Sequence, residues 1–241
     1  MGRWGSLLLQ WEGEEMKNTR KILFFLIVVC TLALATGCAT KQMPKSGFLM
    51  DYSRLKADDP MKKADWVYIN ENVNFGSYKK IMMDQVVFII KDDAKYKGIQ
   101  ADEVKELSEA FAKAVVEALG GSYEFTAEPG PDVMRLRLAI TGVVPNKRAV
   151  GTITTVVPIG LGLSIVKKGL TGSHIGVGGA AFEGELMDSQ TGEVLGAAID
   201  AETGTKYRID KTVTKYGQVK LIFADWANTL KQRLDKLSGR E

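Results

Sequence analysis

The residue best placed for chemistry in this chain is a cysteine in the stretch LALATGCATKQ, residues 32–42. Cys38 directly follows three small residues, Ala35, Thr36 and Gly37. Small side chains let an extended chain lie in a narrow protease cleft, and the cysteine sulfur can form a stable thioether. The sulfur of Cys38 is therefore a chemical handle for covalent attachment.

The residues before this cysteine have the pattern of an export signal. From Met16 the chain reads MKNTRKILFFLIVVCTLALATGC, in which three basic residues precede an uncharged apolar run of 14 residues at 22–35. A helix needs roughly 20 apolar residues to span a bilayer, so this run is short for a permanent anchor. It fits a signal peptide over 16–37. Residues 1–15 carry three acidic side chains, which disfavour export, and we interpret them as a misassigned extension.

The residues around Cys38 resemble the lipobox of bacterial lipoproteins. The resemblance implies cleavage between Gly37 and Cys38 and acylation of the new N-terminal cysteine, which attaches the chain to a membrane. Ala39 follows, and by the Gram-negative sorting rule it favours the outer membrane, with the protein facing the periplasm. Residues 38–46 then form a lipidated tether. Two alternatives stay open: an ordinary cleaved signal with an incidental cysteine, and an uncleaved short anchor.

The composition argues against several other kinds of chemistry. Both cysteines lie in the first fifth of the chain and His174 is the only histidine, which disfavours a zinc site, a redox pair and a Ser/His/Asp triad. The net charge of +3 comes from scattered residues, which disfavours nucleic acid. The acidic pairs Asp58-Asp59 and Asp92-Asp93 are interpreted as solvated turn residues. We therefore assign no catalytic residue, no cofactor and no metal.

Strand patterns occupy several stretches of the folded part. The β-branched, apolar run at 78–90 predicts a buried strand. From Met134, apolar residues alternate with charged ones, which predicts a strand with one wet side. Residues 180–200 predict a β-hairpin that turns at DSQTGE, with Gly192 at positive φ. In its first strand two apolar residues alternate with two acidic ones: Phe182 and Leu186, with Glu183 and Glu185.

Apolar residues at three- and four-residue spacing predict two helices, over 102–119 and about 214–237. Asp102 is the expected N-cap of the first helix, and Gly120-Gly121 ends it. The order of elements predicts an α+β fold, a small and mostly antiparallel sheet with two amphipathic helices packed on one face. We expect this fold to be a single domain over 47–241.

Two apolar stretches outside these elements also need a place. One is a cluster that is expected to dock on the domain, formed by Phe48, Leu49, Tyr52 and Leu55. The other is the Gly-rich segment 149–179, whose first 18 residues carry no charge. Pro158 argues against a membrane helix there. We favour a long β-excursion or hairpin partly buried on the sheet; the alternatives are an apolar flap that contacts lipid or a partner, and an oligomer contact.

Three stretches together resemble one family. They are SGFLMDYSRL at 46–55, YKKIMMDQVVF at 78–88 and AAFEGELMDSQTGEVLGAAID at 180–200. They are similar to the bacterial lipoproteins catalogued as domain of unknown function 3313. The resemblance covers most of 46–236 and implies a lipoprotein with a single domain. It implies no activity and no catalytic residue.

These observations favour a non-enzymatic envelope lipoprotein with a partner-binding or accessory role. Two alternatives are an envelope hydrolase that acts on cell-wall or lipid substrates through loop carboxylates, and a structural lipoprotein that tethers the outer membrane to the cell wall. The expected partners are the membrane, through acylated Cys38, and an envelope protein or a further copy of the chain, through 149–179. Nucleic acid is not an expected partner.

Overall fold

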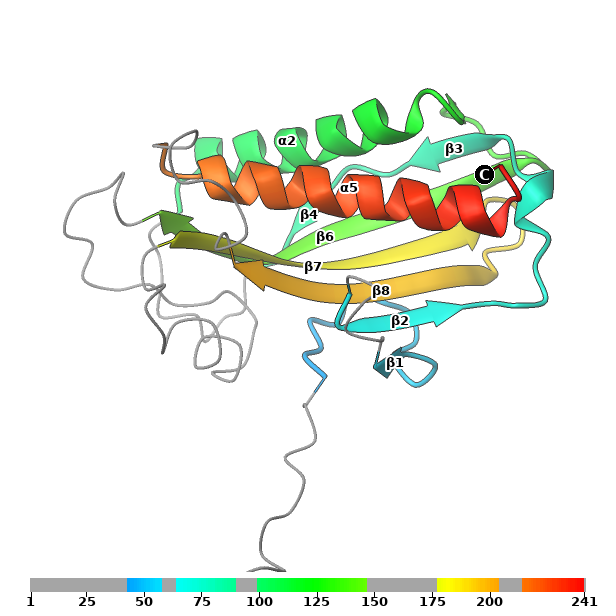
Figure 1. Cartoon of the computed structure of the whole chain (residues 1–241), viewed down its shortest axis with the longest axis horizontal. Coiled ribbons are helices and arrows are strands. Elements are labelled where there is room, and N and C mark those ends of the chain that lie inside the picture. Colours follow the sequence, from blue (N-terminus) through cyan, green and yellow to red (C-terminus); the bar gives the residue numbers. More distant parts are fainter. Residues whose placement is uncertain (1–42, 58–63, 90–98, 147–176, 204–213, 241) are drawn as a thin grey trace, which may run out of the picture. The chain divides into compact units, whose positions relative to one another are not determined.

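The computed structural model describes residues 43–57, 64–89, 99–146, 177–203 and 214–240. These residues build one eight-stranded mixed sheet with two long helices on one of its faces (Figure 1). The predicted α+β fold, with a mostly antiparallel sheet and two packed helices, is confirmed. The strands are β1 (Lys56–Ala57), β2 (Trp66–Ile69), β3 (Lys80–Met83), β4 (Val87–Phe88), β5 (Glu124–Phe125), β6 (Val133–Asn146), β7 (Val177–Asp188) and β8 (Val194–Thr203).

The sheet combines an antiparallel part with a parallel part. Its strand order is β1-β2-β8-β7-β6-β3-β5, and β4 also pairs with β6. The pairs β1–β2, β2–β8, β8–β7 and β7–β6 are antiparallel. The pairs β3–β5, β3–β6 and β4–β6 are parallel. The strand β6 is therefore the boundary between the two parts.

The hairpin of β7 and β8 turns where the sequence predicts it. Asp188 Oδ1 accepts hydrogen bonds from the backbone N–H groups of Gln190 (3.0 Å) and Thr191 (2.7 Å). Gly192 has φ +74, a conformation that glycine adopts without steric penalty. The predicted positive-φ residue is confirmed, and the turn sets the register that puts β7 beside β8.

The segment 78–90, predicted as one strand, forms two short strands that both run parallel to β6. Between β3 and β4 the Asp84 backbone N–H donates to the Leu136 carbonyl at 3.0 Å. The Asp84 carboxylate accepts two hydrogen bonds from the Arg135 guanidinium, at 2.9 and 2.8 Å. The single strand of the prediction is interrupted at 84–86, where its register with β6 shifts by one residue: Met83 pairs with Leu136, and Val87 pairs with Ala139.

The two helices lie side by side on the same face of the sheet (Figure 1). They are α2 (Ala101–Leu119) and α5 (Gly217–Leu237), and a short 3-10 turn, η2 (Phe75–Ser77), precedes β3. The N-cap of α2 is Gln100, not Asp102 as predicted. The Gln100 backbone N–H donates to the Glu103 carboxylate at 3.0 Å, which leaves Asp102 in the first turn, where a negative charge favours the helix dipole.

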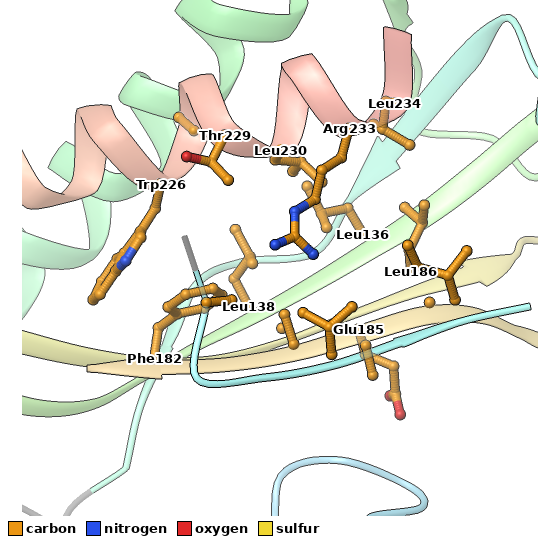
Figure 2. Close-up of a pocket in the computed structure, with 18 of the residues that line it drawn as sticks. Leu136, Leu138, Phe182, Glu185, Leu186, Trp226, Thr229, Leu230, Arg233 and Leu234 are labelled. Atoms are coloured by element: carbon orange, nitrogen blue, oxygen red, sulfur yellow. The ribbon is translucent and has the colours of Figure 1, made fainter. Parts of the chain in front are cut away.

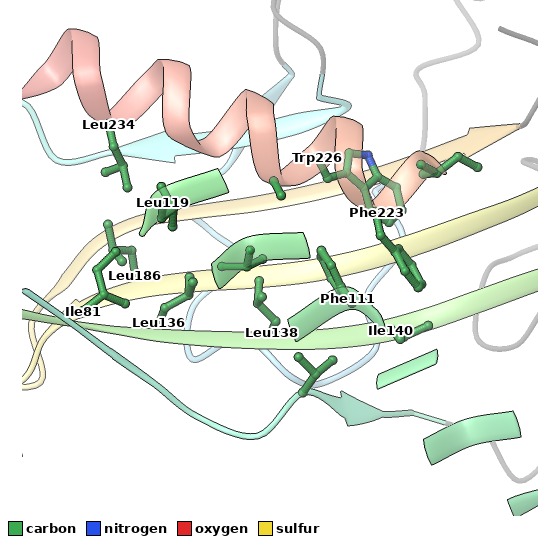
Figure 3. Packing of buried hydrophobic residues seen from close by; sticks show 14 of the residues in the cluster. Ile81, Phe111, Leu119, Leu136, Leu138, Ile140, Leu186, Phe223, Trp226 and Leu234 are labelled. Atoms are coloured by element: carbon green, nitrogen blue, oxygen red, sulfur yellow. The ribbon is translucent and has the colours of Figure 1, made fainter. Parts of the chain in front are cut away.

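Aromatic rings join the helices to the sheet (Figure 3). Phe111 of α2 stacks on Phe223 of α5 with ring centroids 4.7 Å apart, and Trp226 of α5 meets Phe182 of β7 at 4.5 Å. Such pairs add to the free energy gained by burying apolar area. Fully buried side chains around them include Ile81, Leu107, Leu119, Met134, Ile140, Ile222 and Leu234.

The opposite face of the sheet is covered by the first described residues, 43–55, which we call the docked segment. Leu49 and Leu55 are buried against Ala197 and Ile199 of β8. The docking predicted for the apolar cluster at 48–55 is therefore confirmed. The wet side predicted for the strand from Met134 is wrong at Arg137, because Phe48 of the docked segment packs against its guanidinium.

The aromatic core yields a test of the fold. We expect Phe111→Ala to lower the free energy of unfolding by about 3–5 kcal/mol, because it removes a fully buried ring that contacts both Phe223 and Phe182. The control is Val116→Ala on the same helix, at a side chain that is 42% exposed, which should change it by about 0.5 kcal/mol or less. Urea unfolding of the detergent-solubilised chain, followed by tryptophan fluorescence, measures both. Equal effects would contradict this packing.

Candidate functional site

The residues that the sequence marks for chemistry lie outside the described residues. This holds for Gly37 and Cys38, for the acidic pairs at 58–59 and 92–93, and for His174. The apolar segment 149–179 also lies outside them, apart from its last three residues, which begin β7. The roles assigned to these residues stay predictions.

The described part of the chain offers neither a metal-binding group of side chains nor a membrane-spanning helix. Within 43–57, 64–89, 99–146, 177–203 and 214–240, no group of three or more His, Cys, Asp or Glu side chains is placed to hold a metal ion. Over the same ranges no helix is both long and apolar enough to cross a membrane. The unusual features of these residues are buried polar groups and a cavity.

A pair of buried glutamates is the first unusual feature. Glu183 and Glu185 alternate with apolar residues along β7, so both point to the second face, and they are 1% and 2% exposed. Buried carboxylates are unfavourable unless they are hydrogen-bonded or paired with a positive charge. The partners of this glutamate pair therefore decide whether it serves structure or chemistry.

The docked segment supplies most of these partners. The Ser46 backbone N–H donates to Glu183 Oε1 at 2.7 Å, and the Tyr52 hydroxyl donates to Glu183 Oε2 at 2.5 Å. The Met50 backbone N–H donates to Glu185 Oε1 at 2.9 Å. Each bond bridges more than 130 residues of sequence. The segment is thus held to β7 by two backbone N–H groups and one hydroxyl, all of which donate to the glutamate carboxylates.

Arg137 of β6 completes the cluster. Its guanidinium donates to Glu185 Oε2 at 2.6 Å and lies over the ring of Phe48, 4.8 Å from the centroid. All four carboxylate oxygens of the glutamate pair therefore accept a hydrogen bond. Burial raises the pKa of Tyr52, and its hydrogen bond to Glu183 raises it further, so this hydroxyl keeps its proton and remains a donor. The cluster is built to fix the docked segment rather than to move a proton.

An apolar cavity is the second unusual feature. A space of about 110 Å³ lies between α5 and the strands β7, β8 and β2. Figure 2 shows its lining: Trp226, Leu230 and Leu234 come from α5, and Phe182 and Leu138 come from the sheet. Val67, Ile69 and Ala198 complete the floor. Such a cavity can hold an apolar group, and it has few polar atoms that could hold water.

Two polar groups border this apolar space. Figure 2 shows the Arg233 side chain extending from α5 toward the sheet, with Thr229 one turn earlier. Arg233 is half-buried and also takes part in another interaction of the described structure. A guanidinium has five N–H donors, so it can serve more than one acceptor. The cavity therefore combines an apolar interior with a fixed positive charge.

Asp200 of β8 is a buried acid on the helix side of the sheet. Its Oδ2 accepts a hydrogen bond of 2.6 Å from Trp226 Nε1. Burial raises the pKa of Asp200 from 3.8 to about 7; the bond from Trp226 lowers it, and the nearby carboxylates of Asp65 and Glu202 raise it. The acid is therefore largely protonated below neutral pH, and its charge state depends on pH near neutrality.

Sequence reasoning missed the glutamate pair, Arg137, Arg233 and the cavity. An acidic residue at every second position of a strand has the same pattern whether that face is wet or covered. The one available signal was the apolar cluster at 48–55, which indicated that something covers part of the sheet. The sequence does not indicate the cavity, because most of the residues that line it are apolar types that occur in any hydrophobic core.

These features define a class of protein, an α+β domain whose N-terminal segment is locked to the second face of its sheet. The chain belongs to the family described as "Protein of unknown function (DUF3313)", whose model matches residues 44–230. This confirms the resemblance drawn from the sequence. The matched range contains the docked segment from Pro44 on, the glutamate pair and most of α5. No curated protein matches the chain significantly.

Several solved structures are distantly similar. A PelC dodecamer from Paraburkholderia phytofirmans is 12% identical over 68% of this chain and 96% of that chain, at a TM-score of 0.38. A Xanthomonas campestris protein of the family DUF330 is 9% identical over 66% and 88%, at 0.34. A DUF4136 family protein from Bacteroides thetaiotaomicron is 10% identical over 70% and 95%, at 0.35. At these scores nothing about them is transferred to this chain.

The glutamate pair predicts a measurable effect on the docked segment. We expect Glu185→Ala to lower the free energy of unfolding by about 3–5 kcal/mol, because it leaves Arg137 and the Met50 N–H without this acceptor. Trypsin should then cleave faster after Lys45 and Arg54, while the helices stay protected. Unfolding curves and timed proteolysis with mass spectrometry measure the two effects.

The control for this prediction is Glu193→Ala, at an exposed carboxylate that binds the Asn70 side chain. It should change stability by about 1 kcal/mol or less and leave trypsin cleavage unchanged. If Glu185→Ala behaves like Glu193→Ala, the glutamate pair does not hold the segment.

Asp200 predicts a pH dependence of stability. A carboxyl group whose pKa is higher in the folded state stabilises the fold fully below its unfolded pKa, and this contribution is lost as pH rises through the folded pKa. We therefore expect the free energy of unfolding to fall between about pH 4 and pH 7, by up to about 4 kcal/mol. Asp200→Asn keeps an oxygen acceptor for Trp226 and should flatten this fall.

Thermal unfolding across this pH range measures the effect. Asp132→Asn, at a half-buried carboxylate 3.8 Å from Lys80 Nζ, is the control and should keep the wild-type profile. A wild-type stability that rises from pH 4 to pH 7, or an Asp200→Asn variant with the same slope as wild type, would contradict the assignment.

Proposed function

We propose that this chain is an envelope lipoprotein with a non-enzymatic, partner-binding or accessory role. Its anchor is an acyl group on Cys38, added after cleavage between Gly37 and Cys38, and its location is the outer membrane, facing the periplasm. The sequence around Cys38 and the membership of the family support this proposal.

The position of the docked segment carries the proposal. Met43 is the first of the described residues and already packs against the apolar cluster of the docked segment and β8, five residue steps after Cys38 (43 − 38 = 5). A fully extended chain spans at most about 3.6 Å per residue, so Met43 lies within about 18 Å of the modified cysteine. A domain attached this closely meets partners in or near the same membrane. This favours a membrane-proximal accessory protein over a long tether to the cell wall.

The chemistry of the buried carboxylates supports a non-enzymatic role. A hydrolase needs carboxylates that face a cleft and change protonation during the reaction. The oxygens of the glutamate pair instead accept hydrogen bonds from the docked segment and Arg137. The loop carboxylates at 58–59 and 92–93, on which the hydrolase alternative depends, lie outside the described residues.

Metabolic labelling tests the anchor. In a Gram-negative host that makes the full chain with radiolabelled palmitate, we expect the wild type and the Cys30→Ser control to be labelled and to fractionate with the outer membrane. Cys38→Ser should lose the label, because the sulfur is the site of attachment. A labelled Cys38→Ser chain, or an unlabelled wild type, would falsify the anchor.

Purification from detergent-solubilised membranes tests the partner-binding role. We expect a stoichiometric envelope protein to copurify with the wild type and to be depleted with Cys38→Ser, which removes the acyl anchor. A clean wild-type preparation without any stoichiometric companion would count against the proposal.

A further inference from the structure

We propose that the cavity between α5 and the sheet binds the hydrocarbon tail of a free fatty acid, with the carboxylate held at Arg233. The inference goes beyond the proposed function and does not depend on acylation of Cys38. Its three supports are the apolar lining of the cavity, its size and the position of Arg233.

The lining favours a hydrocarbon over water. The roof and floor are formed by side chains such as Trp226, Leu230 and Phe182. A water molecule needs two to four polar partners, and this surface offers few. A hydrocarbon tail gains free energy on burial in proportion to its apolar area and needs no hydrogen bonds.

The size of the cavity favours one chain. An engineered cavity of about 150 Å³ in another protein holds a benzene molecule, and the space under α5 is about 110 Å³. It therefore accepts the end of a single hydrocarbon chain and excludes both tails of a two-chain phospholipid. Gly184 leaves little room for a larger side chain, because an added Cβ would lie 3.0 Å from Leu138 Cδ2 and 3.1 Å from Phe182 Cε2. Ala198 is the floor position at which a larger side chain can fill the space.

The charge at the cavity selects the head group. Arg233 lines the space and reaches from α5 toward the sheet (Figure 2). A guanidinium can bind a carboxylate through two parallel N–H···O bonds, which are stronger than bonds between neutral groups. Its five donors allow it to keep the interaction that it already makes. An apolar side chain of a partner protein, the main competing occupant, would gain nothing from this charge.

Photo-crosslinking of the full chain in lipid nanodiscs tests the proposal. The probe is a diazirine analogue of lauric acid, and peptide mass spectrometry maps the labelled positions. We expect labelling of the peptides that contain Ala198 and Leu230. Lauric acid should suppress it at about tenfold lower concentration than dodecanol, which has the same tail without the carboxylate.

Two variants separate the tail from the head group. Ala198→Phe fills the cavity and should reduce the mapped labelling by about tenfold or more. The control, Ala201→Phe, changes the same strand at a residue that does not line the cavity and should keep it. Arg233→Ala should remove the difference between lauric acid and dodecanol. If the unfolding curve shows that Ala198→Phe does not fold, the result for Arg233→Ala decides.

Three results would overturn the proposal. They are labelling that maps outside the cavity, labelling that survives in a folded Ala198→Phe variant, and competition by lauric acid and dodecanol that is equal in the wild type. Labelling that lauric acid does not suppress would also contradict the proposal, because it shows that the probe does not occupy a fatty-acid site.

Discussion

The burial of two neighbouring carboxylates on β7 is the constraint on which the rest of this structure depends. Burial of Glu183 and Glu185 is strongly unfavourable unless hydrogen-bond donors or positive charges lie beside them. Those donors come from the docked segment and from Arg137 of β6. The docked segment, the hairpin of β7 and β8, and β6 therefore form one cooperative unit. Loss of any one of them leaves charged groups of the others exposed or without a hydrogen-bond partner.

Much of the fold follows from local patterns. The alternation from Met134 predicts a strand, because a two-residue period of apolar residues is typical of strands. The glycine at position 192 predicts the hairpin turn, because glycine is favoured where a turn needs positive φ. The stripes of α2 and α5 predict two helices that share a core. These signals are local, and each is read from fewer than about 25 consecutive residues.

Other features depend on partners that are distant in sequence, and local patterns cannot reveal them. The strand predicted at 78–90 is divided where its register with β6 shifts, and Asp84 at this break binds Arg135, 51 residues away. The parallel pairing of β3 and β4 with β6 depends on how the chain crosses through α2. Glu183 would be exposed on the bare sheet and is buried only because Tyr52 and Ser46 lie over it. The wet side predicted for the strand from Met134 fails for the same reason. A covering segment buries one side of a strand without changing the alternation of apolar and charged residues along it.

The same geometry explains where the cavity lies. The sheet is wide, and two helices cover it unequally: α2 packs toward the β3 and β4 side, whereas α5 packs over β6 and β7 (Figure 1). The floor beyond α5 belongs to β8 and β2, and it carries small residues such as Gly196 and Ala198. A larger core could have been closed by a third helix at this edge. Among the described residues, Arg233 borders the apolar space at this edge of the sheet instead. A charged side chain at the rim of an apolar space suits an amphiphile better than a closed core.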